Sequence, residues 1–174
     1  ENALDRHYFK RSLASLSLKG AGVRFLRDLL KSEIDHRNIL NIIEAEAVGI
    51  DNDDILEMLI PGGRLIPERA FSSIAAGGKN AALDILRGAN RFDMQEFEGA
   101  LAEAKSVNSL DPVITWFNAR EHALLQRMSY LHPVSALPVV NYVAMKVQEV
   151  ADLRLIVRGR LAGLPTEVLE AHIL

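Results

Sequence analysis

Paired acidic side chains are the residues of this sequence best placed for acid–base chemistry. Glu33 and Asp35 lie two positions apart, whereas Glu149 and Asp152 lie three apart and share one face of a helix. Two carboxyl groups can act as general acid and general base. Neither pair is accompanied by a nucleophile, an oxyanion donor or a binding loop. We therefore predict no catalytic residue, and we expect these acids to contact neighbouring helices or a partner chain.

The histidines do not have the spacing of a metal site. Zinc-binding imidazoles on a helix lie three or four residues apart. No two of the five histidines have that spacing: His7, His36, His122, His132 and His172. The sequence also has no cysteine, so it has neither a disulfide nor a thiolate ligand. We expect no bound metal, and the lack of cysteine fits a reducing compartment.

A glycine pair followed by lysine, Gly77-Gly78-Lys79, resembles the end of a phosphate-binding loop. That motif requires glycine where this sequence has Ser73, and serine or threonine where it has Asn80. No strand pattern precedes the glycines. We therefore predict neither a nucleotide site nor any other cofactor.

Three arginines, Arg154, Arg158 and Arg160, make the last long helical segment basic. Two explanations remain open for them. A cation near a helix C-terminus interacts favourably with the helix dipole, which is a purely structural role. Alternatively, the planar guanidinium groups dock onto carboxylates of an acidic partner.

Composition excludes several classes of function. The net charge of −3 and the lack of an arginine cluster with interleaved aromatic residues argue against nucleic-acid binding. The longest apolar segment is interrupted by Lys146, Glu149, Asp152 and Arg154, so it does not read as a membrane span. The chain begins ENALDRHYF without methionine. We expect it to be a fragment of a longer protein.

The elements that must position these residues are helices, because the apolar residues recur at helical spacing. The predicted class is all-α, with Asp93, Ser135 and Thr166 as helix N-caps. A break is expected at Gly77-Gly78. The expected helices cover residues 2–18, 21–48, 54–60, 67–75, 80–87, 94–107, 111–131, 135–164 and 166–174.

The longest expected helix, 135–164, carries one apolar stripe and would be roughly 45 Å long. We call these residues the α-stripe: Val143, Val147, Val150, Leu153, Val157, Leu161 and Leu164.

A segment nearer the N-terminus is similar in sequence to this helix. A shift of 114 positions superposes similar residues: Asp35 on Glu149, Asn38 on Asp152, Ile42 on Ile156 and Gly49 on Gly163. We interpret this as an internal repeat, with a helical module at 1–112 around a core of 21–50, and a related module at 113–174 around a core of 135–164. The alternative is a coincidence between two ordinary amphipathic helices.

Four segments resemble a known family, namely the C subunit of archaeal and bacterial A/V-type ATP synthases, which is equivalent to the d subunit of the vacuolar ATPase. The segments are LDRHYF (4–9), EIDHRNILNII (33–43), LIPGGRL (59–65) and YVAMKVQEVADLRLIVRGRLAGLP (142–165). The resemblance spans the chain and is weakest between residues 77 and 131.

The resemblance implies long helices in a funnel of three related modules around a pseudo-threefold axis, of which this chain lacks the N-terminal one. It implies a non-catalytic central-stalk subunit, a socket that couples the axle subunits (D/F type) to the proteolipid ring (c/K type) during ATP-linked ion transport. The expected location is peripheral, on the cytoplasmic side, with membrane contact only through the ring. The candidate structural or interaction residues are Asp35, Asn38, Glu149, Asp152, Arg154, Arg158 and Arg160.

The competing hypothesis is a free-standing helical adaptor with stacked helix pairs. Such a protein is expected to repeat every 30 to 50 residues, whereas the offset found here is 114. An enzyme is a third hypothesis, and it lacks a set of catalytic residues.

Overall fold

The computed structural model describes residues 2–16, 20–90, 92–170 and 173, and within them the chain is all-α, as predicted, with no strand. The expected helix ends at residues 18 and 174 lie outside the described residues. The elements are α1 (Asn2–Ser15), α2 (Ala21–Val48), α3 (Asn52–Met58), the 3₁₀ helix η1 (Glu68–Ala70), α4 (Phe71–Arg87), α5 (Met94–Val107), α6 (Asp111–Leu131), α7 (Leu137–Leu161) and α8 (Thr166–Glu170).

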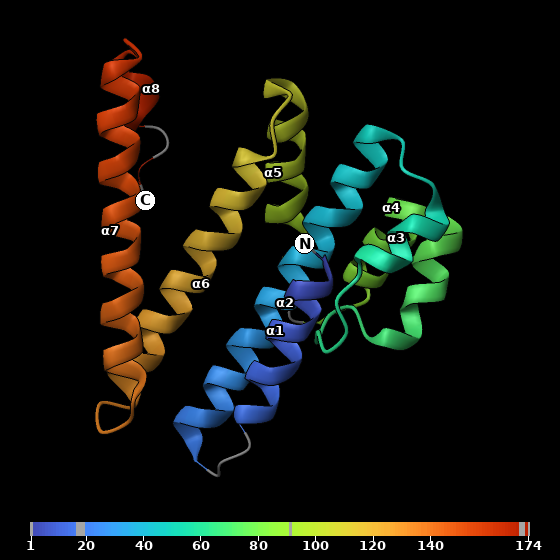
Figure 1. Cartoon of the computed structure of the whole chain (residues 1–174), viewed down its shortest axis with the longest axis horizontal. Helices are drawn as coiled ribbons and strands as arrows, with labels where there is room; N and C mark the ends of the chain where they lie inside the picture. The colour runs from blue at the N-terminus through green and yellow to red at the C-terminus, as the bar shows by residue number, and fades with distance from the viewer. Residues whose placement is uncertain (1, 17–19, 91, 171–172, 174) are drawn as a thin grey trace. The chain divides into compact units, whose positions relative to one another are not determined.

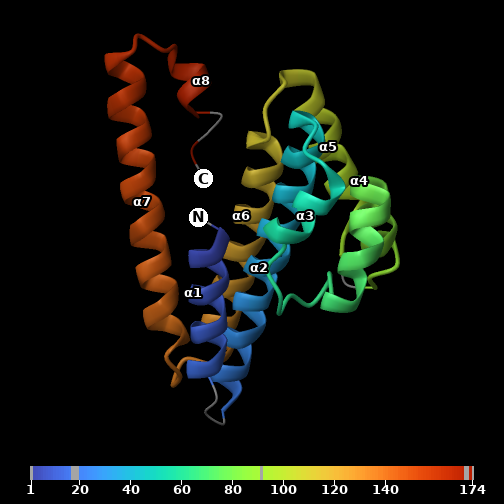
Figure 2. The same ribbon diagram turned by 45° about the vertical axis from the view of Figure 1, so that its right-hand side comes forward.

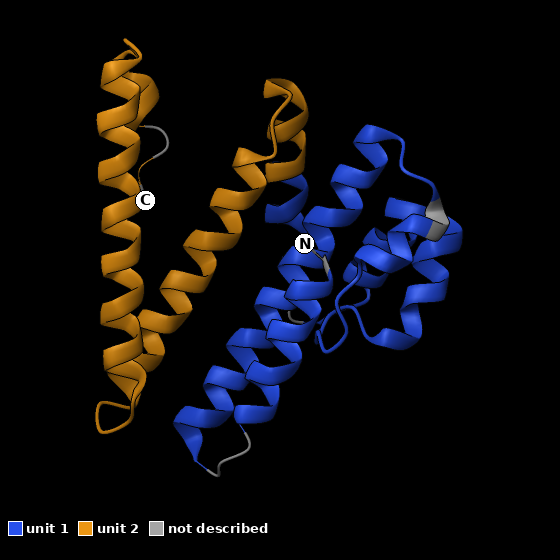
Figure 3. Ribbon diagram, viewed as in Figure 1, with its two compact units in different colours: residues 1–99 blue, residues 100–174 orange. Residues whose placement is uncertain are grey.

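The chain divides into two compact units, residues 1–99 and 100–174 (Figure 3). The division falls within α5, whereas the sequence places a module boundary at residue 112. A compact unit is defined by contacts among its own residues, whereas a repeat is defined by the similarity between two segments of the sequence. The modular boundary therefore stays a prediction.

Unit 1 is built around α2. Helix α1 lies beside α2 in both views (Figures 1 and 2), and α3 and α4 also pack against α2. Phe9 of α1, Ile34 of α2 and Ile60 after α3 form a buried cluster, with Leu13 and Leu30 packed against it. The apolar face of α2 is therefore covered by three other helices, which fixes the polar side chains that share this face.

The break expected at Gly77-Gly78 is present as a kink, which separates two helical stretches within α4. Helix α4 runs from Phe71 to Arg87, and a kink at Gly78, with φ 57° and ψ −144°, interrupts its helical geometry. Glycine adopts a positive φ without the steric penalty that a side chain imposes. The segment after Pro67 also begins as a short 3₁₀ turn.

Unit 2 contains a helical hairpin, in which α6 and α7 run antiparallel, and α8 folds back against α7 (Figure 1). Val113, Phe117 and Leu125 of α6 and Leu137 of α7 are buried. Leu169 of α8 packs directly over Gly159, where an added Cβ would overlap the leucine side chain.

Helices α2 and α7 end in the same way. Gly49 directly follows α2 with φ 75°, and Gly163 follows Ala162 after α7 with φ 76°, so both glycines have the left-handed conformation. This ending is common at helix C-termini, where it satisfies the last carbonyl groups. The shared ending supports a local similarity between the C-terminal ends of the two helices. The repeat of whole modules stays a prediction. The equivalent hydrogen bonds run from the N–H of Ile50 to the carbonyl of Ala45 and from the N–H of Leu164 to that of Gly159, both at 2.9 Å.

Candidate functional site

Asp35 is a buried carboxylate that holds a loop. It lies on the apolar face of α2 with no exposed surface. Its Oδ2 accepts hydrogen bonds from the backbone N–H groups of Arg64 at 2.7 Å and Leu65 at 2.8 Å, and its Oδ1 accepts one from Ile66 at 3.0 Å. Three consecutive amides that no helix satisfies are thus bound by one side chain.

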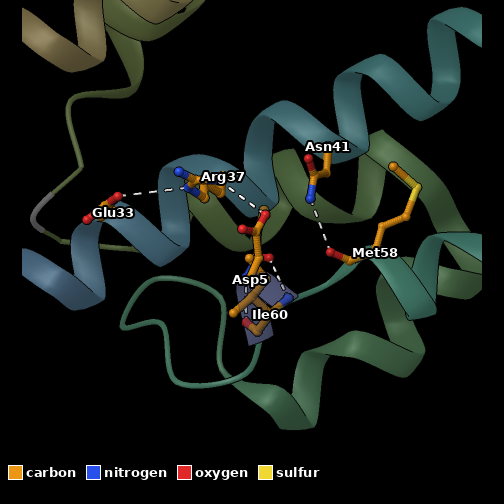
Figure 4. Close-up of polar contacts among 7 residues, drawn as sticks. Asp5, Glu33, Arg37, Asn41, Met58 and Ile60 are labelled. Carbon is orange, nitrogen blue, oxygen red and sulfur yellow. Dashed lines mark hydrogen bonds and ion pairs between the residues drawn. The ribbon is translucent and has the colours of Figure 1, made fainter. Parts of the chain in front are cut away.

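Asn38, one turn further along α2, binds the preceding part of the same loop. Its Nδ2 donates to the carbonyl of Ile60 at 2.9 Å, and its Oδ1 accepts from the N–H of Ile60 at 2.7 Å. Asn41 donates to the carbonyl of Met58 at 3.1 Å (Figure 4). We call residues 58–66 the anchored loop, because polar side chains of α2 fix its backbone at both ends.

Helix α1 adds contacts to the start of this loop. The guanidinium of Arg6 donates to the carbonyl of Leu59 at 3.0 Å and to that of Leu56 at 2.8 Å. Arg37 of α2 pairs with Asp5 of α1 at 3.2 Å and lies 3.9 Å from Glu33 (Figure 4). The two helices and the loop therefore form one hydrogen-bonded assembly.

Two glycines allow the loop to approach α2 closely. Gly62 has φ 109°, and an added Cβ would lie 2.9 Å from the side chain of Leu13. An added Cβ at Gly63 would overlap the carboxylate of Asp35. The sequence Pro-Gly-Gly is thus required by the contact with Asp35 as well as by the turn.

Burial raises the pKa of the Asp35 carboxyl above its ordinary range, because desolvation disfavours the charged form. The three backbone N–H donors and the nearby His36 oppose this rise by stabilising the carboxylate. The arrangement is a structural anchor, since both carboxylate oxygens accept hydrogen bonds from backbone N–H groups of the loop.

The acids of α7 lie in a different environment from Asp35 and Asn38. Glu149 is exposed and pairs with Lys146, and Asp152 accepts a hydrogen bond from Gln148 at 2.8 Å. Both contacts lie within α7, so the expected contact with a neighbouring helix or a partner chain stays a prediction. Glu149 and Asp152 line an open groove of about 670 Å³ between α6 and α7, together with His122.

The three predicted arginines are exposed on the C-terminal half of α7. None of them makes an ion pair with a residue that the structure describes. Arg154 and Arg158 border a shallow hollow of about 270 Å³, whose apolar lining consists of Val150, Leu153 and Val157. Cationic groups thus flank an apolar surface that is open to solvent.

The α-stripe is exposed along its whole length, from 41% at Leu164 to 84% at Leu161. The buried residues of α7 are Leu137 and Gly159. With 100° between successive residues, both project from the side of the helix opposite to the α-stripe. The pattern correctly groups these residues on one face, and the structure places other residues of α7 in the interior.

The remaining sequence candidates do not form a chemical site. Lys79 pairs with Glu46 at 2.7 Å, which ties the kinked helix α4 to α2. Within the described residues, no three metal-binding side chains gather at one point. None of the described helices combines the length and the hydrophobicity needed to cross a bilayer.

The structure therefore separates the seven candidates into two groups that belong to different units. Asp35 and Asn38 anchor a loop in unit 1, and the other five line the surface of α7 in unit 2. Sequence reasoning missed Arg6 and Asn41. The available signal for Asn41 was its position three residues after Asn38, within a run of isoleucines.

Comparison with known proteins identifies one family. Residues 1–172 match the family described as ATP synthase (C/AC39) subunit. The A-type ATP synthase C subunit of Haloquadratum walsbyi is 33% identical over 94% of this chain and 46% of its own length. Those of Haloferax volcanii and Archaeoglobus fulgidus are 31% and 29% identical, over 99% and 98% of this chain and 48% and 47% of their own length. No solved structure matches.

The chain spans about half the length of the curated relatives that it matches. Within that half, the match includes both the α2 segment with its anchored loop and helix α7. The fold and the family match thus agree with the resemblance carried by these segments, and the chain belongs to the ATP synthase (C/AC39) subunit family.

Proposed function

We propose that this chain is part of a non-catalytic coupling subunit of a rotary A-type ATP synthase. In this role it is a peripheral socket on the cytoplasmic side that connects the central-axle subunits to the proteolipid ring during ATP-linked ion transport. The observation that carries the proposal is the family match over residues 1–172. The relatives are named as the C subunit of A-type ATP synthase, and this name states the complex to which they belong.

The anchored loop supports a mechanical role. A coupling part must keep its shape while torque passes through it, and close-packed interiors transmit strain. In unit 1, Asp35, Asn38 and Arg6 replace the regular backbone hydrogen bonds that an irregular loop lacks. A loop that is hydrogen-bonded along its backbone to two helices deforms less than a loop held only at its ends.

The exposed arginines of α7 support docking to other subunits. Arg154 and Arg158 have no ion-pair partner among the described residues, so their charges are available to carboxylates of the axle or the ring. Charge complementarity favours one docking orientation and speeds association. We therefore assign Arg154 and Arg158, together with Glu149, to contacts at the rim of the socket.

A pull-down assay tests this proposal. The chain is tagged, and axle subunits and detergent-solubilised proteolipid ring of the same complex are added at moderate salt. The double variant Arg154→Glu with Arg158→Glu should retain less axle or ring than the unaltered chain, because like charges then face each other. The matched control is Arg11→Glu with Arg24→Glu, which changes the net charge equally at two exposed positions of unit 1.

Capture of neither axle nor ring by the unaltered chain would refute the coupling role. Equal capture by both double variants, with unchanged helix content by circular dichroism, would refute the assignment of Arg154 and Arg158 alone.

A further inference from the structure

We propose that the α-stripe of α7 is the docking surface for an amphipathic helix of the same subunit, supplied by the half of the relatives' length that this chain does not cover. This inference rests on the family membership and on the surface of α7. It does not depend on the coupling role, since neither the axle nor the ring takes part.

Helix α7 carries an apolar face that is exposed to solvent along its length. The seven residues of the α-stripe are all exposed, and Val139 and Tyr142 extend the same face toward the N-terminus of the helix at 66% and 61% exposure. The opposite side carries the buried Leu137 and the half-buried Leu155. The α-stripe is thus a contiguous apolar surface that lies away from the buried residues of α7, and exposed apolar patches of this kind mark interaction surfaces.

The surface chemistry describes the occupant. The shallow hollow at Val150, Leu153 and Val157 accepts an apolar side chain. Arg154 and Arg158 border this hollow and lie four residues apart, so they stand one above the other on the helix. A complementary helix has an apolar stripe of its own, which packs on the α-stripe beside the two guanidinium groups and leaves them available for the contacts proposed above.

The length of the relatives identifies the source. The matched region covers 46–48% of the C-subunit sequences from three organisms, so as much polypeptide again belongs to the same subunit. A lipid surface fits less well, because Lys146 falls within the arc of the α-stripe by its helical position and pairs with Glu149. Burial of that pair in an acyl environment is unfavourable, whereas a protein partner can leave it at the edge of the interface.

Thiol accessibility tests the proposal, because the chain has no cysteine of its own. Single variants Val147→Cys and Val157→Cys report on the α-stripe, and Glu103→Cys reports on an exposed position of α5 in unit 2. The probe is the half of the Archaeoglobus fulgidus C subunit that lies outside the match, added in trans. We expect a one-to-one complex in which both α-stripe cysteines react with maleimide at least about tenfold more slowly, while the Glu103→Cys chain reacts at an unchanged rate.

A second variant separates loss of binding from loss of folding. Val147→Glu combined with Val157→Glu should weaken the complex by at least about a hundredfold, since two buried apolar contacts are replaced by charges. Both positions are exposed in the isolated chain, so its helix content should not change.

Five results would overturn the proposal. Slow reaction of both cysteines in the monomeric chain alone would mean that this chain covers its own α-stripe. Protection that appears only on self-association would identify a second copy as the occupant, and protection only on anionic vesicles would identify a membrane surface. Failure to form a complex at about 100 μM, or a complex without protection, would remove the assigned partner.

Discussion

Replacement of Asp35 by asparagine should loosen the anchored loop without disturbing the rest of unit 1. The amide has nearly the same shape as the carboxylate but only one acceptor oxygen. If that oxygen takes the place of Oδ2, the amides of Arg64 and Leu65 keep their partner. The new NH₂ group then faces the N–H of Ile66, which at 3.0 Å now bonds to Oδ1.

The magnitude follows from the loss of one acceptor for a buried donor, which costs about 1–3 kcal/mol. Part of this cost is offset in the variant, because the neutral amide avoids the desolvation cost of the buried carboxylate, the same cost that raises the pKa of Asp35. We expect a net loss of about 1–2 kcal/mol in the stability of the loop contact at neutral pH. Opening of the loop should then become about 5- to 30-fold more frequent.

Hydrogen exchange measured by mass spectrometry checks this prediction locally. Peptides that contain residues 64–66 should exchange faster in Asp35→Asn, and peptides from α7 serve as the internal reference. Glu44→Gln is the matched control, since it makes the same change of charge at an exposed position of α2. Gly63→Ala should reproduce the effect from the loop side by pushing against the Asp35 carboxylate. Unchanged exchange at residues 64–66 in both variants would refute the anchoring role.

Three further changes test individual contacts. Gly159→Ala should release α8, because the new methyl group overlaps Leu169, and limited proteolysis should then cleave α8 faster. In the Leu169→Ala background the overlap is absent, so adding Gly159→Ala should not increase the rate of cleavage further. Gly49→Ala should lower the free energy of unfolding by about 1–2 kcal/mol in urea titrations, since φ is 75° there and alanine is strained in that conformation. Asp93→Ala should cost about 1 kcal/mol in the same assay, by removing the cap on the N–H of Glu96, and Asp93→Ser should restore most of it.

Helix positions could be predicted well wherever the signal is local. The bounds predicted for α2, 21–48, agree with the structure because Gly20 and Gly49 enclose an uninterrupted helical pattern. Asp93 caps α5 as expected, with Oδ1 accepting the N–H of Glu96 at 3.1 Å. The break at Gly77-Gly78 was also predicted from the glycine pair, and the structure has its kink at Gly78.

The candidate site could be predicted only in part. Helical periodicity states which residues share a face of α7, but it does not state what covers that face. The sequence therefore predicted the α-stripe, but it did not predict that these residues are exposed to solvent. Asp35 and Asn38 were selected through the similarity at a shift of 114 positions, yet their hydrogen-bond partners lie 22–31 positions further along the chain. No local pattern connects an acid in a helix with the amides of a later loop.

The separation between Asp35 and its loop has a consequence for folding order. Closing a chain segment of about 30 residues costs conformational entropy before any contact compensates for it. A carboxylate that leaves water is stabilised fully only when all three amides of residues 64–66 have arrived. We therefore expect α2 to form first and the loop to close onto it in one late step. The segment between α3 and α4 would then set the unfolding rate of unit 1 more than its folding rate.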